Sequence, residues 1–260
     1  MKCIVCVKQV PDTSGKVAVK EDGTMDRASM DTITNPDDLN ALEAALKLKD
    51  ATGCEVVVIT MGPPPAEGML RELLARGADK AVLVSGREFG GSDTWATSYI
   101  IATAIKKIPD YDIIFCGRQA IDGDTAQVGP QIAEQLNIPQ ITYVQKLDIE
   151  GDKVIVQRQL EDGYTVVEAK MPVLLTAIKE LNTPRYMTPK GIFEAYNKTV
   201  QVWGFNDVPV DAEKIGLKGS PTNVNRTFSP EAKGKGIMLE GADKETVKTL
   251  IAKLDEKHLL

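Results

Sequence analysis

Residues 54–85 read CEVVVITMGPPPAEGMLRELLARGADKAVLVS, and this stretch decides the fold. The run Cys54–Met61 is short and rich in valine, a composition typical of a strand buried on both faces. Apolar residues at helical spacing follow over Ala66–Arg76, and a second apolar run covers Ala81–Ser85. A strand, a helix and a second strand in this order predict one unit of a parallel sheet.

The same alternation extends in both directions from this unit. Short apolar runs predict further buried strands at Cys3–Val10, Asp112–Gly117 and Pro172–Ile178. Helical patterns lie over Asp37–Lys49, Asp93–Lys106 and Gln127–Leu136. We therefore expect an α/β fold with a doubly wound, mostly parallel sheet of the Rossmann-like, adenine-nucleotide-binding type.

The pattern changes after Pro139. Three extended segments, Ile141–Ile149, Lys153–Leu160 and Tyr164–Lys170, are separated by short turns that contain glycine. This arrangement predicts an antiparallel hairpin addition to the parallel sheet. Residues 183–191 are punctuated by proline and glycine, which predicts a loop.

The C-terminal part of the chain has the character of an arm. Residues 200–205 could pair as a strand, residues 243–256 have a helical pattern, and the stretch between them has little periodicity. Such a long irregular stretch is unusual inside a compact domain. Because it keeps Trp203, Phe205 and Leu217, we expect it to cover a partner. The expected division is residues 1–199 as the nucleotide-binding domain and 200–260 as the C-terminal arm and helix.

Composition excludes several classes of protein. The net charge of -6 argues against a nucleic-acid binder, which needs a basic face. No apolar run approaches the roughly 20 residues of a membrane span. The cysteines lie within apolar stretches, which favours a reducing, cytoplasmic location. On a strand, Cys3 and Cys6 point to opposite faces, so we expect buried, inert thiols there and no metal pair.

Catalytic side chains are scarce. The only histidine is His258, near the C-terminus, so a Ser-His or Cys-His nucleophile and a zinc site are not expected. Whether the protein is itself an enzyme stays open. A nucleotide site with few catalytic side chains suits a protein whose cofactor performs the chemistry.

Ligands of doubly wound sheets bind beyond the carboxyl ends of the strands. Four loops fall at such ends: residues 35–38, 61–65, 89–94 and 117–130. Asn35, Ser92 and Thr125 could simply cap helices, and for each loop alone we favour capping. The 117–130 loop is long, rich in glycine and carries an arginine, so we expect it to bind a ligand.

Standard nucleotide fingerprints are absent from the sequence. No G-x-G-x-x-G follows the first predicted strand, and no Walker A sequence is present. Gly90-Gly91-Ser92-Asp93 is faintly similar to the pyrophosphate loop of ATP pyrophosphatases. An adenylating or pyrophosphate-releasing enzyme is therefore a weak alternative, because the loop lacks its leading serine and no catalytic base is apparent.

Several motifs together resemble the beta subunit of electron-transfer flavoproteins. The most specific is Gln119-Ala120-Ile121-Asp122-Gly123-Asp124, and the resemblance covers essentially the whole chain in order. Supporting motifs begin at Cys6, Asn35, Met61, Gly77, Lys170, Asn182 and Gly219. The sequence around Arg118 and over Gln127–Pro130 resembles that of the electron-bifurcating members, whose beta subunit holds FAD.

The resemblance implies a heterodimer with an alpha subunit that carries its own FAD. In bifurcating members, the FAD of the beta subunit takes hydride from NADH. One electron then passes to the alpha FAD, toward an acyl-CoA dehydrogenase or similar flavoenzyme, and the other to ferredoxin or flavodoxin. In ordinary members, the beta subunit binds a structural AMP and acts as a scaffold, which is the alternative.

The resemblance also implies the binding residues. Cys6 and Val7 are expected at the adenine edge, and Thr94 in a turn that contacts NADH. The others surround the nucleotide: Asn35, Asp38, Met61, Gly62, Gly117, Arg118, Gln119, Ala120, Asp122, Gly123, Asp124, Thr125, Ala126, Gln127, Val128 and Gly129. The backbone of residues 123–127 should face phosphates, Asp122 should bond ribose or backbone donors, and Arg118 should favour reduced, anionic flavin.

The segment 182–195 corresponds to the family's recognition loop, which docks onto the acceptor dehydrogenase. Expected docking residues are Arg185, Tyr186, Met187, Pro189, Ile192 and Phe193. Prolines stiffen the segment, and aromatic and aliphatic side chains can anchor an interface. An internal packing loop is the alternative.

Overall fold

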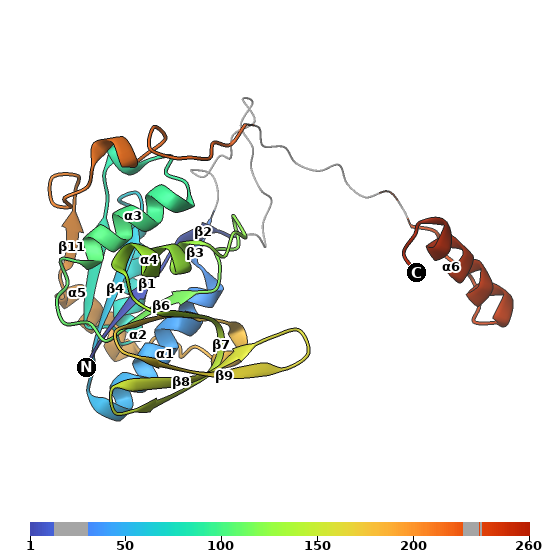
Figure 1. Ribbon diagram of the computed structural model, residues 1–260, viewed down its shortest axis with the longest axis horizontal. Coiled ribbons are helices and arrows are strands. Elements are labelled where there is room, and N and C mark those ends of the chain that lie inside the picture. The colour runs from blue at the N-terminus through green and yellow to red at the C-terminus, as the bar shows by residue number, and fades with distance from the viewer. Residues whose placement is uncertain (13–30, 226–233, 235) are drawn as a thin grey trace. The chain divides into compact units, whose positions relative to one another are not determined.

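The computed structural model describes residues 1–12, 31–225, 234 and 236–260. The chain forms two compact units, Met1–Thr227 and Phe228–Leu260. The first unit contains one large sheet of nine strands in the order β11-β5-β4-β1-β6-β10-β7-β8-β9 (Figure 1). The strands are β1 Lys2–Cys6, β4 Glu55–Met61, β5 Lys80–Val84, β6 Ile113–Gly117, β7 Gln140–Glu150, β8 Lys153–Gln159, β9 Tyr164–Lys170, β10 Val173–Ala177 and β11 Val200–Trp203.

Strand directions confirm the mostly parallel, doubly wound fold. The seven strands from β11 to β7 run parallel to their neighbours. Strand β8 pairs antiparallel with β7, and β9 pairs antiparallel with β8, so both extend the sheet as the turn pattern predicted. Helices cover both faces: α1 Pro36–Thr52, α2 Ala66–Arg76, α3 Thr94–Ile105, α4 Val128–Leu136 and α5 Pro189–Asn197.

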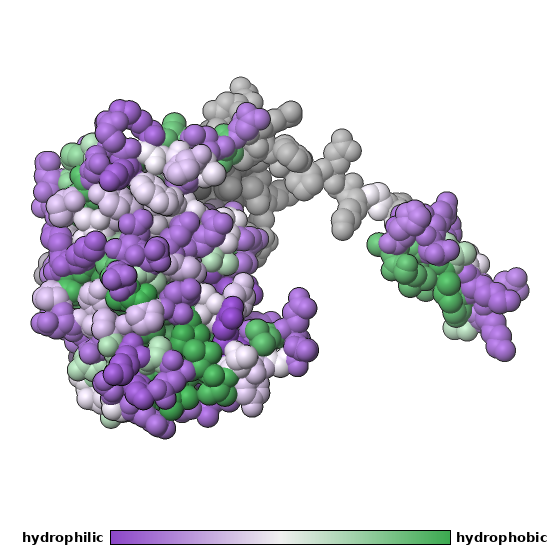
Figure 2. All heavy atoms as spheres, in the orientation of Figure 1, coloured by the Kyte–Doolittle hydropathy of each residue, from purple (hydrophilic) through white to green (hydrophobic). Residues whose placement is uncertain are grey.

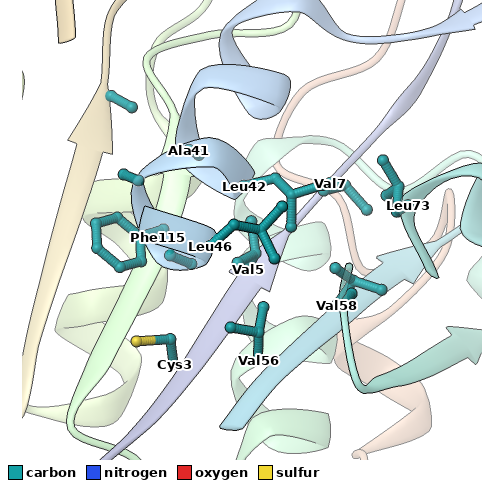
Figure 3. Close-up of a cluster of buried hydrophobic side chains, with 14 of the residues drawn as sticks. Cys3, Val5, Val7, Ala41, Leu42, Leu46, Val56, Val58, Leu73 and Phe115 are labelled. Carbon is teal, nitrogen blue, oxygen red and sulfur yellow. The ribbon is translucent and has the colours of Figure 1, made fainter. Parts of the chain in front are cut away.

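Alternate side chains of each central strand enter two separate cores. Cys3 and Val5 of β1 lie in the core that contains residues of α1, α2 and α5 (Figure 3). Ile4 and Cys6 lie in the core that contains residues of α3 and α4. Because both faces of these strands are buried, nearly all of their residues are apolar. All four cysteines are buried and free, as expected for the thiols.

The strand order creates one switch point, between β1 and β6. From β1 the chain proceeds outward to β4 and β5, and then returns across the sheet to β6. The helices that follow β1 and β6 therefore begin on either side of the same crevice. In sheets of this kind, ligands bind at this crevice.

The predicted strand Cys3–Val10 is wrong in its second half. β1 ends at Cys6, and β2, Gln9–Pro11, pairs antiparallel with β3, Thr32–Thr34, in a separate small sheet. The break has a physical cause at Lys8. Its backbone N–H donates to Asp38 Oδ2 at 2.8 Å, so the chain turns away from the large sheet there.

The predicted loop over residues 183–191 is also wrong in part, because α5 begins at Pro189. Thr188 caps this helix by accepting a hydrogen bond from Gly191 N at 3.0 Å. Proline suits the first helical turn, where its missing N–H is not needed. Beyond α5, β11 joins the sheet next to β5, so the sheet extends past the boundary expected at residue 199.

The second unit contains α6, Lys244–Glu256, where the sequence predicted a helix. Asp243 caps it by accepting from Thr246 N at 2.8 Å. Val247, Leu250 and Ile251 are about half exposed, and Figure 2 shows the apolar side of this helix in green. Residues 226–233 of the expected arm lie outside the described residues. Among the described helices, none is long and apolar enough to cross a membrane.

Candidate functional site

The 117–127 loop leaves the end of β6 at the switch point and leads into α4. Its first residue, Gly117, is buried against the start of α1. A Cβ atom at Gly117 would lie 2.7 Å from the backbone nitrogen of Asp38 and 2.8 Å from the carbonyl carbon of Asp37. Only glycine lets the two segments approach so closely.

Asp38 joins the ends of β1 and β6. Its Oδ2 accepts from Lys8 N at 2.8 Å, and its Oδ1 accepts from Gly117 N at 2.9 Å. The side chain is buried, and burial raises the pKa of Asp38 to about 7, although these hydrogen bonds act in the opposite direction. Both carboxylate oxygens are therefore used to hold two strand ends together.

Asn35 holds the next part of the loop. Its Nδ2 donates to Gln119 O at 2.8 Å, and its Oδ1 accepts from Ile121 N at 3.1 Å. Asn35 occupies the N-cap position of α1, as expected, but its side chain makes no cap hydrogen bond to the helix. The side chain is 1% exposed, so this amide is fully committed to the backbone of the loop.

Two ion pairs complete the attachment. Arg118 Nε lies 3.4 Å from Asp37 Oδ2, and Lys8 Nζ lies 2.6 Å from Asp122 Oδ1. Asp122 thus has a side-chain partner, whereas the sequence predicted ribose or backbone donors for it. Between Gly117 and Asp122 the loop is held at nearly every residue by the start of α1 and by Lys8.

The second half of the loop is free in comparison. Asp124 and Ala126 adopt left-handed backbone conformations, with φ of 49° and 52°. Among the residues that the structure describes, the N–H groups of Thr125 and Ala126 donate to no protein acceptor. Consecutive N–H groups in such a turn form a concave site for an anion.

The start of α4 adds to this site. Gln127 occupies the N-cap position and makes no side-chain cap hydrogen bond, so the interpretation of Thr125 as the cap is wrong. By contrast, α3 is capped by Asp93, not by the expected Ser92. An uncapped helix start offers free N–H groups and the positive end of the helix dipole to an anion.

Most other predicted site residues lie at the same rim. Met61 is the last residue of β4, which neighbours β1, and Gly62 follows it. Thr94 begins α3, and its Oγ1 donates to Gln127 Oε1 at 3.1 Å. The side chains of Cys6 and Val7 are buried in the two cores. Gly129 is buried beside Thr176, while Val128 starts α4.

Comparison with known proteins identifies the family. The model of the "Electron transfer flavoprotein domain" matches residues 22–208. The chain belongs to the electron transfer flavoprotein family.

Three relatives match over their full length and over the full length of this chain. "Acryloyl-CoA reductase electron transfer subunit gamma" of Anaerotignum propionicum is 59% identical, with 100% of each chain covered. "Caffeyl-CoA reductase-Etf complex subunit CarD" of Acetobacterium woodii is 53% identical, also with 100% coverage of each chain. "Electron transfer flavoprotein subunit beta" of Clostridium acetobutylicum is 54% identical, again with 100% coverage of each chain.

The predicted docking segment of this flavoprotein is exposed but firmly anchored. Tyr186, Ile192 and Phe193 are 89%, 41% and 77% exposed. Arg185 differs, because its guanidinium binds Glu43 of α1 in bidentate geometry, with Nε–Oε2 and Nη2–Oε1 distances of 2.8 and 3.0 Å, and also contacts Asp50. Arg185 therefore holds the segment in place.

Sequence reasoning missed three residues of these surfaces. Lys8 and Asp37 hold the loop through their ion pairs, and Tyr196 extends the exposed aromatic surface of α5 with 75% exposure. Lys8 and Asp37 are sequence neighbours of predicted site residues. Their role in holding the loop depends on ion pairs with residues about 80 to 114 positions away in the sequence, which no local pattern indicates. Tyr196 lies three residues after Phe193, on a helix that the sequence analysis treated as a loop.

We expect Asn35→Ala to release the first half of the loop in this flavoprotein. The change removes both contacts to Gln119 and Ile121 and leaves their backbone groups without partners, which costs about 1–3 kcal/mol. Hydrogen exchange should therefore accelerate over residues 118–124 and stay unchanged in β4. Asn197→Ala, at the exposed C-terminal end of α5, is the control. Equal exchange in the two variants would contradict the role of Asn35.

Proposed function

We propose that this chain is the small, beta-type subunit of a heterodimeric electron transfer flavoprotein and binds the adenine nucleotide of FAD at the β1–β6 switch point. The observation that carries the proposal is the turn at residues 124–126, which leads into the uncapped start of α4. Within the described part of the chain, the N–H groups of Thr125 and Ala126 in this turn have no protein acceptor. Both features favour a diphosphate. The strand-end loops around this turn would supply the remaining contacts to the nucleotide.

The donor set of the site fits such a nucleotide. The phosphates would lie against the N–H groups of residues 125–127, with the Thr125 hydroxyl beside them. Gly123 and Thr125 are exposed, so a ligand can reach this turn. Protein contacts hold the loop from Gly117 to Asp122 in place. This half of the loop positions residues 123–127, which would bind the phosphates.

We further propose the electron-bifurcating type. FAD, when bound, supplies the chemistry: it accepts hydride from NADH and passes one electron toward the alpha-subunit FAD and the other toward ferredoxin or flavodoxin. The role of this chain is to bind, orient and shield that group. The similarity to electron transfer subunits named for acryloyl-CoA and caffeyl-CoA reductases supports a complex with a flavoenzyme of the acyl-CoA dehydrogenase type.

The Arg118 side chain is the positive group next to this site. Its contact with Asp37 leaves it 37% exposed, with the remaining guanidinium N–H groups able to reach a ligand. We propose that it favours the reduced, anionic flavin. Arg118→Ala should then slow reduction by NADH, and unchanged reduction kinetics would contradict this role.

A count of bound cofactors tests the proposed type. The heterodimer is purified, its nucleotides are released by denaturation, and flavin and AMP are quantified per complex. We expect two flavins and no AMP. One flavin with one AMP would instead support the alternative, a scaffold subunit with a structural nucleotide. Absence of both from this chain would contradict nucleotide binding.

The exposed aromatic surface of α5 is the proposed docking site for the acceptor flavoenzyme. Phe193→Ala removes a large exposed apolar side chain, and such anchors contribute about 1–3 kcal/mol to an interface. We expect electron transfer to the acceptor to need about 10-fold more acceptor for half-maximal rate, with NADH-dependent flavin reduction unchanged. Tyr164→Ala, an exposed aromatic on β9, is the control and should have no effect.

The C-terminal arm is proposed to pack on the alpha subunit. In α6 the apolar residues Val247, Leu250 and Ile251 recur at helical spacing, and within the described residues no core covers them. A cytoplasmic location is proposed as well, because all four cysteines are free and buried.

A further inference from the structure

A pocket of about 320 Å³ lies away from the nucleotide rim, between the end of α2, the 185–188 segment and the start of α5. This volume is at the lower end of the range for sites of small ligands. Its charged lining residues are Lys49, Arg76, Arg185, Lys190, Lys198 and Glu194. Positive charge therefore predominates in the wall.

Carboxylates neutralise only part of this charge. Lys49 Nζ is paired with Asp79 Oδ1 at 2.6 Å, Arg185 is paired with Glu43, and Lys190 lies 3.6 Å from Glu194. In the described part of the chain, neither Arg76 nor Lys198 has a carboxylate partner. They donate to backbone carbonyls of Arg185 and Ala78. A carbonyl dipole offsets only a fraction of a full charge.

Two further features point to an oxyanion. Arg76 Nε is buried and has no hydrogen-bond partner, so one strong donor stays unused. Lys190 and Gly191 belong to the first turn of α5, whose dipole adds positive potential to the pocket. The C-terminal end of α2 also borders the pocket. There Lys49 and Lys198 donate to the carbonyls of Gly77 and Ala78, which follow the helix.

The close contact between the two helices shapes the site. A Cβ atom at Gly191 would collide with the carbonyl oxygen of Ala75, so glycine lets the start of α5 lie against the end of α2. Arg76 at the end of α2, Lys190 in the first turn of α5 and Lys198 at the end of α5 thereby border one space. We propose that this pocket binds a small oxyanion, either a phosphate or a carboxylate, that bridges α2 and α5.

Titration of the full chain with inorganic phosphate, and separately with acetate, tests the site. Backbone amide signals of Lys190 and Gly191 are followed by NMR at constant ionic strength. We expect saturable shifts, and a dissociation constant raised at least 10-fold in Arg76→Gln and in Lys198→Gln. Lys146→Gln removes an exposed cation of β7 and should leave binding unchanged.

The two ligands distinguish the sources of the oxyanion. Tighter binding of phosphate assigns the pocket to phosphate groups, and tighter binding of acetate assigns it to carboxylates. The absence of saturable shifts with both ligands in the unmodified protein would overturn the proposal. So would equal binding in Arg76→Gln, Lys198→Gln and Lys146→Gln. None of these outcomes depends on a nucleotide bound at the β1–β6 rim.

Discussion

Gly117→Ala is expected to destabilise the protein by about 3–5 kcal/mol and to abolish nucleotide binding. The added methyl would lie 2.7 Å from Asp38 N and 2.8 Å from the Asp37 carbonyl carbon, both backbone atoms that no rotamer change can move. Either α1 or the loop must shift. The shift would break the hydrogen bond from Gly117 N to Asp38, which closes the rim.

The same loop offers a matched control. Gly123 has open space around its Cβ position, so Gly123→Ala should change the free energy of unfolding by less than about 1 kcal/mol. Urea unfolding and nucleotide content after purification measure both effects. Equal stability and equal nucleotide content in the two variants would refute the close approach of α1 to the loop.

Asp38→Ala is expected to cost about 2–4 kcal/mol at pH 7, because the N–H groups of Lys8 and Gly117 lose their buried acceptor. The removal of a carboxylate from the surface should cost little in comparison. Asp148→Ala is the control, since Asp148 is more than half exposed on β7 and forms an ion pair with Lys146.

The effect of Asp38→Ala should also depend on pH. Burial raises the pKa of Asp38 to about 7, whereas an aspartate in an unfolded chain titrates near 3.9. Between these values the folded protein binds the proton more tightly than the unfolded chain does. The stability that Asp38 contributes is therefore complete in acid and declines as the pH rises through 7.

Unfolding measured at pH 5 and pH 8 tests this linkage. The difference in free energy of unfolding between the unmodified protein and Asp38→Ala should be larger at pH 5, by about 2 kcal/mol. Asp148→Ala should show no such change. If this difference in free energy is the same at both pH values, burial does not raise the pKa of Asp38.

Local chemistry made the central fold predictable. The helix at Ala66–Arg76 and the strand at Tyr164–Lys170 have the bounds that the sequence predicted. The spacing of apolar residues is sufficient to predict these elements. Apolar residues that recur every 3.6 residues indicate a helix, and those that recur every second residue indicate a strand, with that side facing a core. The failures have equally specific causes: Lys8 leaves the sheet to reach Asp38, and Pro189 starts a helix in a segment that resembles a loop.

The sequence by itself determined that the chain is a doubly wound α/β protein with its glycine-rich loop at a strand end, because apolar period and turn chemistry are local properties. Only the tertiary structure decided what the polar residues of that rim do. The side chain of Asn35, at the N-cap position of α1, binds the backbone of Gln119, and Asp122 pairs with Lys8. These contacts join residues far apart in the chain, and no local pattern encodes which of them meet when β1 and β6 become neighbours.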